Sequence, residues 1–254
     1  MGTSKNNKTI LTSVQNGISI LKLFSKEQPI WGLTEIANSL HLPKSTVSRL
    51  VSDLVVEGYL EKEKSKYQLG LSLLGLSGVI TSNMEIHREA IDSLKMLVQK
   101  LGESAHIAIL EESNVVYILK EECKHPVRLL SHVGKNNPAS CTSSGKVLLA
   151  YEPAERIKQV LESGLIKLGP NSITDPEILL KQLTLVKQNG FALCIDEMHE
   201  DVVSIAAPIK DYTGEVVAAV SVVGPKQRID KEKISLFIVE VVKTGNEISS
   251  KLGY

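Results

Sequence analysis

The sequence predicts an α+β protein in two parts, an N-terminal winged helix-turn-helix and a larger C-terminal domain with a mainly antiparallel sheet. Three observations support this prediction. Apolar residues recur at helical spacing through the first 54 residues, two strand-like runs flank a charged loop at 62–66, and helical and strand patterns alternate after residue 84. We therefore expect a disordered tail at 1–12, the winged helix-turn-helix at 13–70, a linker helix at 71–83 and the second domain at 84–254.

The composition is that of a soluble globular protein, with 43% apolar and 23% charged residues. No apolar run reaches the roughly 20 residues that span a bilayer, and the N-terminus lacks the apolar core of a signal peptide. We therefore expect a cytoplasmic protein with no membrane partner. Net charge is zero, but residues 1–75 carry nine Lys and Arg against six Asp and Glu. This small excess of positive charge suits a module that binds phosphates.

The first predicted helix covers residues 13–25, with Ser13 as its N-cap. Its apolar residues recur at helical spacing: Val14, Ile18, Leu21, Leu23 and Phe24. A second helix is expected from about Thr34, with its inner face formed by Leu33, Ile36, Ala37 and Leu40. Because a tight turn follows at 41–43, the two short helices on either side of it form a helix-turn-helix.

The third predicted helix begins at Pro43 and buries Val47, Leu50, Val51 and Leu54. Its opposite face carries small donors and cations, which suit a groove lined with acceptors and phosphates. We expect the DNA-contacting residues of this helix to be Lys44, Ser45, Thr46, Ser48, Arg49 and Ser52. Arg49 is able to bind a guanine edge or a phosphate, and the sequence does not choose between them. The alternative is an ordinary solvated helix face.

A β-hairpin is predicted over residues 59–70, where two short strands flank a lysine-rich loop. This hairpin is the wing beside the helices. Lys62 and Lys64 are predicted to contact the DNA backbone or minor groove, although Glu61 and Glu63 weaken the positive charge. A solvated loop without DNA contact remains an alternative.

The linker at 71–83 is strongly apolar, which favours a helix packed against a partner chain over packing within its own chain. In the second domain we expect helices at 85–101, 146–151, 155–163, 176–188 and 230–252. Strands are expected at 105–110, 115–120, 127–130, 192–195, 203–209 and 216–223. Short turns between neighbouring strands indicate antiparallel pairing.

A polar loop of small residues at 139–146 runs into the predicted helix at 146–151. Unpaired amides and the helix dipole make a helix N-terminus a favourable site for a carboxylate. We therefore predict that Ser143 and Ser144 bind an anionic group of a ligand. The alternative is a helix cap with no ligand.

The motifs together resemble the isocitrate lyase regulator (IclR) family of bacterial transcription factors over nearly the whole chain. In the first domain the matching segments are 33–37 (LTEIA), 42–50 (LPKSTVSRL), 58–60 (GYL) and 67–70 (YQLG). In the second they are 143–150 (SSGKVLLA), 190–192 (GFA), 205–209 (IAAPI) and 214–225 (GEVVAAVSVVGP). The resemblance implies a sequence-specific repressor or activator of a catabolic operon, bound as a dimer or tetramer to a palindromic site in double-stranded DNA.

The resemblance also implies a GAF-like second domain that binds a small organic acid. It places further walls of the effector pocket at Leu129, Cys194, Ser204, Ser221 and Val223. Relatives commonly have an acidic residue in place of Cys194, whereas Glu197 keeps the second acidic position. A thiol in place of a carboxylate either removes a repulsion toward an anionic ligand or loses an acceptor, so the effector's identity is not transferable from a relative.

Catalysis and cofactor binding are not expected. The chain contains neither a complete phosphate-binding P-loop nor a nucleophile elbow. The three cysteines match no zinc pattern, and a metal site using Cys123 and His125 is only a minor alternative. A stronger rival is a winged helix with an architectural or protein-binding role, which predicts weak, sequence-indifferent DNA contact and no response to a ligand.

Overall fold

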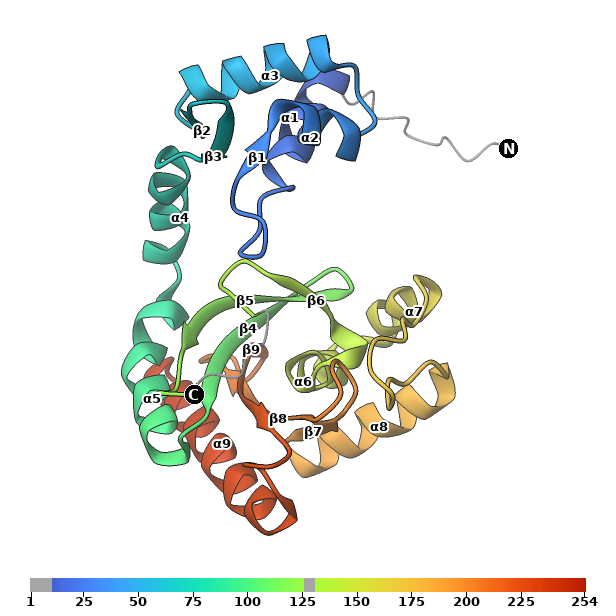
Figure 1. Cartoon of the computed structure of the whole chain (residues 1–254). Coiled ribbons are helices and arrows are strands. Elements are labelled where there is room, and N and C mark those ends of the chain that lie inside the picture. The colour runs from blue at the N-terminus through green and yellow to red at the C-terminus, as the bar shows by residue number, and fades with distance from the viewer. Residues whose placement is uncertain (1–10, 126–130) are drawn as a thin grey trace, which may run out of the picture. The chain divides into compact units, whose positions relative to one another are not determined.

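A computed structural model describes residues 11–125 and 131–254 of the chain, which divides into two compact units between Asn83 and Met84 (Figure 1). The predicted tail at 1–12 lies mostly outside the described residues, as does the strand predicted at 127–130. The predicted fold class, a helix-turn-helix domain followed by an α+β domain with an antiparallel sheet, is confirmed.

The first unit is helical with a small antiparallel sheet of order β1-β3-β2. Its helices are α1 (Thr12–Leu21), α2 (Leu33–Ser39), α3 (Lys44–Val56) and α4 (Ser72–Ser82). Its strands are β1 (Trp31–Gly32), β2 (Leu60–Glu63) and β3 (Lys66–Leu69). The apolar faces of the first three helices meet in one core, whose buried residues are Ile20, Ile36, Ala37, Val47, Val51 and Leu60.

Helix α1 differs from the prediction at both ends. It starts one residue before Ser13, so Leu11 and not Ser13 occupies the N-cap position, and it ends at Leu21 instead of residue 25. The Trp31 indole Nε1 donates to the Leu23 carbonyl at 3.1 Å, which ties the segment after α1 to β1. The two-residue strand β1 was not predicted, because so short a strand leaves no periodic pattern.

The second unit contains a six-stranded antiparallel sheet of order β6-β5-β4-β9-β8-β7. The strands are β4 (Ser104–Glu111), β5 (Asn114–Glu121), β6 (Asn136–Pro138), β7 (Ala192–Ile195), β8 (Val202–Lys210) and β9 (Val216–Pro225). Because β4 pairs with β9, strands from the two ends of this unit's sequence lie side by side at the centre of the sheet.

Helices cover both faces of this sheet (Figure 1). One face packs against α5 (Glu85–Leu101) and α9 (Lys231–Lys251). The other packs against α6 (Ser143–Tyr151), α7 (Ala154–Glu162) and α8 (Pro176–Asn189). Each face of the sheet has its own apolar core, so both faces of the central strands are buried.

Strand alternation decides which residues face α6. In β8, Val203 and Ile205 join the core under α5 and α9, whereas Ala206 joins the core under α6. Successive side chains of a strand point to opposite faces, so Ser204 shares the α6 side with Ala206. In β9, Ser221 follows the same rule. Small polar side chains are thereby placed on the α6 side of an otherwise apolar sheet.

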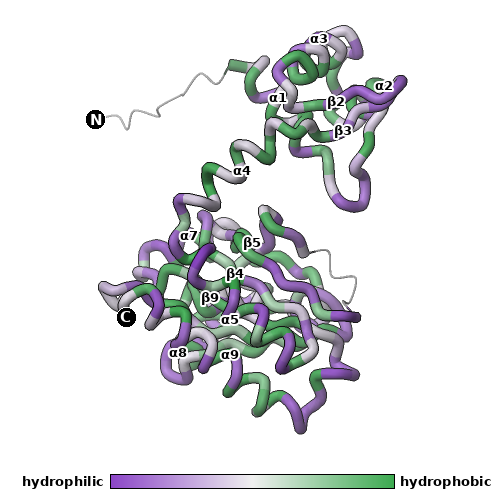
Figure 2. Tube along the Cα trace, turned by 90° about the vertical axis from the view of Figure 1, so that its left-hand side faces the viewer, coloured by the Kyte–Doolittle hydropathy of each residue, from purple (hydrophilic) through white to green (hydrophobic). Residues whose placement is uncertain are grey.

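Helix α4 has no buried residue. Most of its apolar side chains are exposed. Leu71 just before the helix, and Leu74, Leu76, Val79 and Ile80 within it, each have more than half of their surface accessible. Figure 2 shows the helix largely in green and white, the colours of apolar and intermediate residues. Among the described residues, no helix combines the length and the apolar character that crossing a membrane requires.

Candidate functional site

The outer face of α3 is polar and accessible. Lys44, Ser45, Ser48, Arg49 and Ser52 are all exposed, and Thr46 is half-buried. Val47 and Val51 lie on the opposite side of the helix and are almost completely buried in the core of this unit. Burial of one face therefore fixes the helix so that the predicted DNA-contacting residues are on its free surface.

The helix begins sharply, which places these side chains at its start. His41 in the preceding turn has a φ of +52°, and the Val47 amide donates to the Pro43 carbonyl at 3.1 Å. Proline suits the start of a helix because its missing N–H would be unpaired there in any case. Lys44 and Ser45 consequently occupy the first turn, where unpaired amides also favour a phosphate.

The wing formed by β2 and β3 presents its lysines to solvent. Lys62 and Lys64 are exposed, and Lys64 adopts a φ of +56° at the hairpin tip. The Lys62 ammonium lies 5.9 Å from the centre of the Tyr67 ring, and Gln68 donates to Glu61 at 3.0 Å. These contacts hold the lysine and a carboxylate on the same hairpin, so the wing carries a mixed charge.

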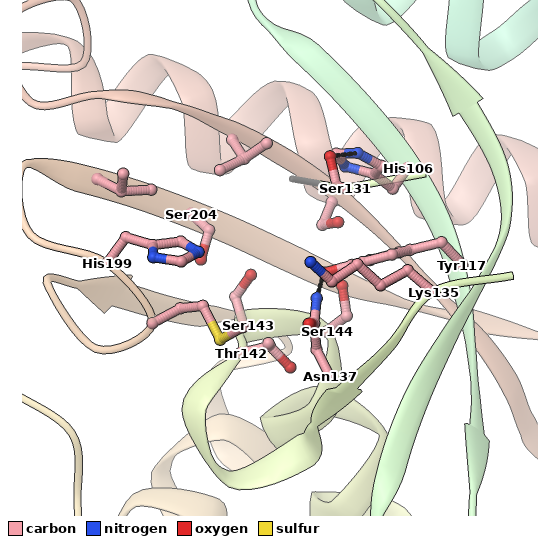
Figure 3. Close-up of a pocket in the computed structure, with 14 residues that line it drawn as sticks. His106, Tyr117, Ser131, Lys135, Asn137, Thr142, Ser143, Ser144, His199 and Ser204 are labelled. Carbon is pink, nitrogen blue, oxygen red and sulfur yellow. Dashed lines mark hydrogen bonds between the residues drawn. The ribbon is translucent and has the colours of Figure 1, made fainter. Parts of the chain in front are cut away.

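A pocket in the second unit lies between the sheet, the first turn of α6 and two connecting segments (Figure 3). It has about 540 Å³ of empty space, part of it open to solvent. The described residues that line it are His106, Tyr117, Ser131, Lys135, Asn137, Thr142, Ser143, Ser144, Met198, His199, Val202, Ser204, Ser221 and Val223. Eleven of these fourteen side chains carry a polar group, so the pocket offers hydrogen bonds to a small ligand within a surface that is mostly apolar.

Strand pairing brings the sheet residues of the pocket together. Ser204 on β8 is opposite Val223 on β9, and Ser221 is opposite His106 on β4. All four line the pocket. Positions separated by more than 100 residues in the sequence thus form one continuous patch on the α6 side of the sheet.

The first turn of α6 forms the facing wall. Thr142 caps the helix by accepting from the Gly145 amide at 3.1 Å. The Lys146 amide donates to the Thr142 carbonyl at 3.0 Å. These bonds use the amides of the third and fourth residues, whereas the amides of Ser143 and Ser144 precede any intrahelical acceptor. The positive end of the helix dipole is therefore directed at the pocket.

Gly145 allows α6 to start at this place. A Cβ atom at position 145 would lie 2.2 Å from the Ala139 carbonyl oxygen, within the short 3₁₀ turn Ala139–Cys141 that precedes the helix. The turn and the helix are therefore in backbone contact. This close packing also explains why every residue of α6 before Tyr151 is buried.

The pocket has a positive character. Lys135 contributes a formal charge, and among the described residues none of those lining the pocket is Asp or Glu. Burial, with a smaller contribution from the charge of Lys120, lowers the pKa of His106 to about 3. His106 is therefore a neutral imidazole at physiological pH, and its Nε2 lies 3.0 Å from the Ser131 hydroxyl. Burial also lowers the pKa of His199.

Tyr117 and Asn137 form a second polar group at one side of the pocket (Figure 3). The Asn137 amide donates to the Tyr117 hydroxyl at 3.4 Å. Burial raises the pKa of Tyr117, so the phenol stays protonated and keeps its own hydrogen to donate. The pocket thus offers a hydroxyl donor in addition to the helix amides and Lys135.

The structure brings most of the sequence-predicted effector residues to this pocket. Ser143, Ser144, Ser204, Ser221 and Val223 line it. Leu129 lies outside the described residues. Cys194 is not among the lining residues; it is buried in β7, and burial raises the pKa of its thiol, which also interacts with Lys146 and Glu197.

Lys146 and Glu197 form an ion pair beneath the pocket. The Lys146 ammonium is 2.6 Å from Glu197 Oε1 and 2.7 Å from Gln182 Oε1, and the lysine is fully buried. Neither residue lines the pocket. Sequence analysis predicted no such role for Lys146, because a lysine after a helix start usually reaches solvent.

Several lining residues were missed by sequence analysis, in particular His106, Tyr117, Lys135, Asn137 and His199. The alternation of β4 was a usable signal for His106, since it interrupts an apolar strand. For Lys135 and His199 no such signal exists, because both lie in irregular segments.

The described residues contain no group of three His, Cys, Asp or Glu side chains able to hold a metal, and the Cys123 thiol accepts from the Ser104 hydroxyl at 3.5 Å.

Comparison with known proteins gives matches to two family models. The model described as the bacterial transcriptional regulator IclR C-terminal domain matches residues 79–250, more than half of the chain. The IclR helix-turn-helix domain matches residues 13–64.

Similar proteins cover nearly the entire chain. The HTH-type transcriptional regulator KdgR of Escherichia coli is 32% identical over 247 residues, which are 96% of this chain and 94% of KdgR. An IclR homolog from Microbacterium hydrocarbonoxydans, solved in complex with 4-hydroxybenzoate, has a TM-score of 0.84 at 26% identity, covering 95% of this chain and 99% of that one. The Thermotoga maritima IclR structure has a TM-score of 0.79 at 27% identity, covering 95% and 99%.

Proposed function

Because the chain belongs to the IclR family of bacterial transcriptional regulators, we propose that it reads a promoter through α3 and responds to a small carboxylate in the pocket beside α6. It is a DNA-binding transcriptional regulator of a family whose members control catabolic operons. We further propose which residues contact DNA, which residues bind the effector, and how the chains assemble. We also propose that the protein acts in the cytoplasm, where bacterial DNA is accessible.

The exposed polar face of α3 supports its role as the recognition helix. Its serines are small and allow the helix to approach the bases closely, and Arg49 provides the planar donor that recognises guanine or clamps a phosphate. Lys44, Ser45, Thr46, Ser48, Arg49 and Ser52 form the proposed contact surface, with Lys62 and Lys64 of the wing on the adjacent backbone.

Replacement of Arg49 tests this assignment. DNA fragments that the protein selects from a random-sequence library provide the target without knowledge of the operon. Arg49→Ala is expected to weaken binding by about 1–3 kcal/mol and to relax selectivity at one base position. The matched control is Arg88→Ala on α5, whose side chain is 70% exposed and lies in the other unit. Equal affinity and selectivity of Arg49→Ala and wild type would remove α3 from the interface.

The exposed apolar surface of α4 supports a homodimer. Five large apolar side chains without burial in their own unit form an unfavourable surface in water, and a second copy of the helix would cover them. Two recognition helices held by a symmetric dimer fit a palindromic DNA site, with half-sites about one helical turn apart. Further association of two dimers into a tetramer is compatible with the same palindromic DNA site.

The single observation that supports an acidic effector is the charge of the pocket. The first turn of α6, whose Ser143 and Ser144 amides precede any intrahelical acceptor, lines it together with Lys135 and several hydroxyls, and no described lining residue is a carboxylate. Ser143 and Ser144 are the proposed binders of the ligand's anionic group. Ser204, Ser221 and Val223 form the opposite wall. Cys194, the cross-strand partner of Ser204, is buried next to that wall.

Polar groups placed within a mostly apolar surface favour an acid that also carries a hydroxyl group. His106, Ser131, Tyr117 and Asn137 provide donors and acceptors away from the α6 amides. A site built to bind a hydroxyl discriminates strongly against an analogue that lacks it, because the buried polar groups are then left unpaired. We therefore propose a small hydroxy acid as the effector class.

A thermal-shift panel tests the effector proposal. Gluconate and 4-hydroxybenzoate are compared with glucose and 4-hydroxybenzamide, which keep the hydroxyls but lack the charge. At least one acid is expected to raise the melting temperature through linkage, and its neutral counterpart is not. Ser143→Asp places a negative charge at the amides and is expected to abolish the shift, whereas Ser235→Asp, at an exposed position of α9, is not. Equal shifts in both variants would remove α6 from the site.

A further inference from the structure

The connection between β7 and β8, residues 196–201, forms one wall of the pocket. Met198 and His199 of this connection line the pocket, whereas Glu197 points away from it and pairs with Lys146. Asp196 and Asp201 at its two ends both have a φ of +60°. Aspartate adopts left-handed backbone more readily than most residues, and Lys226 holds both ends: its ammonium lies 2.6 Å from Asp196 Oδ2, and its amide donates to the Asp201 carbonyl at 2.9 Å.

The ion pair between Lys146 and Glu197 joins this wall to the wall formed by α6. Lys146 belongs to α6, whose first turn presents the Ser143 and Ser144 amides, and its ammonium contacts both Glu197 and Gln182 of α8. One lysine therefore links the helix that forms one side of the pocket with the connection that forms the other.

Burial of this pair is costly. Each ion loses its hydration, and the mutual attraction often only offsets that loss, so an apolar pair of similar volume can be equally stable. The Glu197 Oε2 atom is also buried and has no hydrogen-bond partner among the described residues. Stability alone does not account for such an arrangement, whereas fixing the position of the connection does.

We propose that Lys146 is a positioning residue of the pocket, which acts through Glu197 to hold the 196–201 connection, and with it Met198 and His199, at a fixed distance from the first turn of α6. The inference rests on the proposed function in one respect, namely that this pocket is the effector site. Lys146 and Glu197 act without contacting the ligand.

The variant that tests this removes both charges. Lys146→Met alone would leave Glu197 as an unpaired buried charge and risk unfolding, so the test uses Lys146→Met/Glu197→Gln in the full chain. The control is Glu103→Gln/Arg228→Met, which removes another ion pair with a buried carboxylate, between residues that do not line the pocket.

Amide hydrogen exchange without any ligand is the measurement. Three amides report on the connection, because each forms a backbone hydrogen bond within it or at its ends. Gly169 donates to the Glu197 carbonyl at 2.9 Å, Asn171 to the Asp196 carbonyl at 3.0 Å, and Asp196 to the Val202 carbonyl at 2.9 Å. In the double variant their exchange is expected to rise about tenfold through local opening, while the paired amides of β4 and β9 stay within about twofold of wild type.

The outcomes separate local from general effects. The control pair is expected to leave the three reporting amides at their wild-type rates. Wild-type exchange at these amides in a folded double variant, or a rise no larger than that of β4 and β9, would overturn the proposal. Failure of every acid to shift the melting temperature would count against the effector proposal instead and would leave the exchange result intact.

Discussion

At the scale of single residues, the pocket depends on a histidine that stays neutral. His106 is buried on β4 beside Ser131 and Tyr117, and its pKa is lowered to about 3. An unfolded chain binds a proton at this histidine below pH 6.5, whereas the folded chain does not until about pH 3. Stability therefore falls as the pH decreases through this window, by up to about 1.4 kcal/mol per pH unit.

Replacement of His106 is expected to reduce that pH dependence. Urea unfolding of wild type between pH 6.5 and 5 should give a free energy that decreases with acidification. His106→Gln is expected to have a smaller slope, whatever its stability at pH 7. His199→Gln is measured in the same way, because burial lowers the pKa of His199 as well. An unchanged slope in His106→Gln would show that the imidazole is not held neutral.

At this scale, site residues were predictable from the sequence where they belong to a regular helix or strand. Ser143 and Ser144 were identified from the helix start, and Ser204, Ser221 and Val223 from the family resemblance. The family resemblance placed Cys194 on the pocket wall, whereas in the structure it is buried beside its cross-strand partner Ser204 and interacts with Lys146 and Glu197 without lining the pocket. Strand alternation places Cys194 on the same face of the sheet as Ser204, but it does not show which part of that face α6 covers and which part stays open to the pocket.

At the scale of elements, the start of α6 depends on backbone contact with the turn before it. A side chain at position 145 would meet the Ala139 carbonyl at 2.2 Å, and neither backbone segment is free to move within the core. Overpacking of this kind commonly costs about 1–3 kcal/mol.

Gly145→Ala is therefore expected to destabilise the second unit by about 1–3 kcal/mol and to weaken acid binding. Gly17→Ala in α1 is the matched control, since nothing lies within 4 Å of a Cβ there and helix propensity favours alanine. Urea unfolding measures both. A Gly145→Ala variant as stable as wild type would mean that α6 and the preceding turn are not tightly packed.

Helix α4 gives the second prediction at this scale. Its exposed apolar residues include Leu76 and Ile80, one turn apart, and the proposed dimer buries them. Leu76→Lys/Ile80→Lys is expected to shift the protein toward monomer in sedimentation velocity. Met96→Lys on α5, where the methionine is 62% exposed, should leave the assembly unchanged. A double-lysine variant that sediments as wild type would exclude α4 from the interface.

Most elements of the second unit occupy the ranges that their periodicity predicted, including α5 at Glu85–Leu101 and β7 at Ala192–Ile195. Short elements did not, because β1 and β6 are too brief to show a period. In α1, the residues predicted by helical spacing continued past the end of the helix. Leu23 lies after the end of the helix, where its carbonyl accepts from the Trp31 indole.

At the scale of the whole molecule, the two units have different surfaces. The first presents an exposed polar face of α3, and the second encloses a pocket of positive character. A regulator must couple the two sites thermodynamically, so an acid that alters DNA affinity is itself bound with an affinity that DNA alters by the same factor. An architectural winged helix would bind DNA without any such dependence.

The most direct test of this account is the dissociation constant for a selected DNA fragment, measured with and without an acid that raises the melting temperature. The account predicts a change of about fivefold or more for wild type, in either direction, and none for Ser143→Asp. An acid that stabilises the protein through this pocket yet leaves DNA affinity unchanged would contradict the claim that the pocket controls DNA binding.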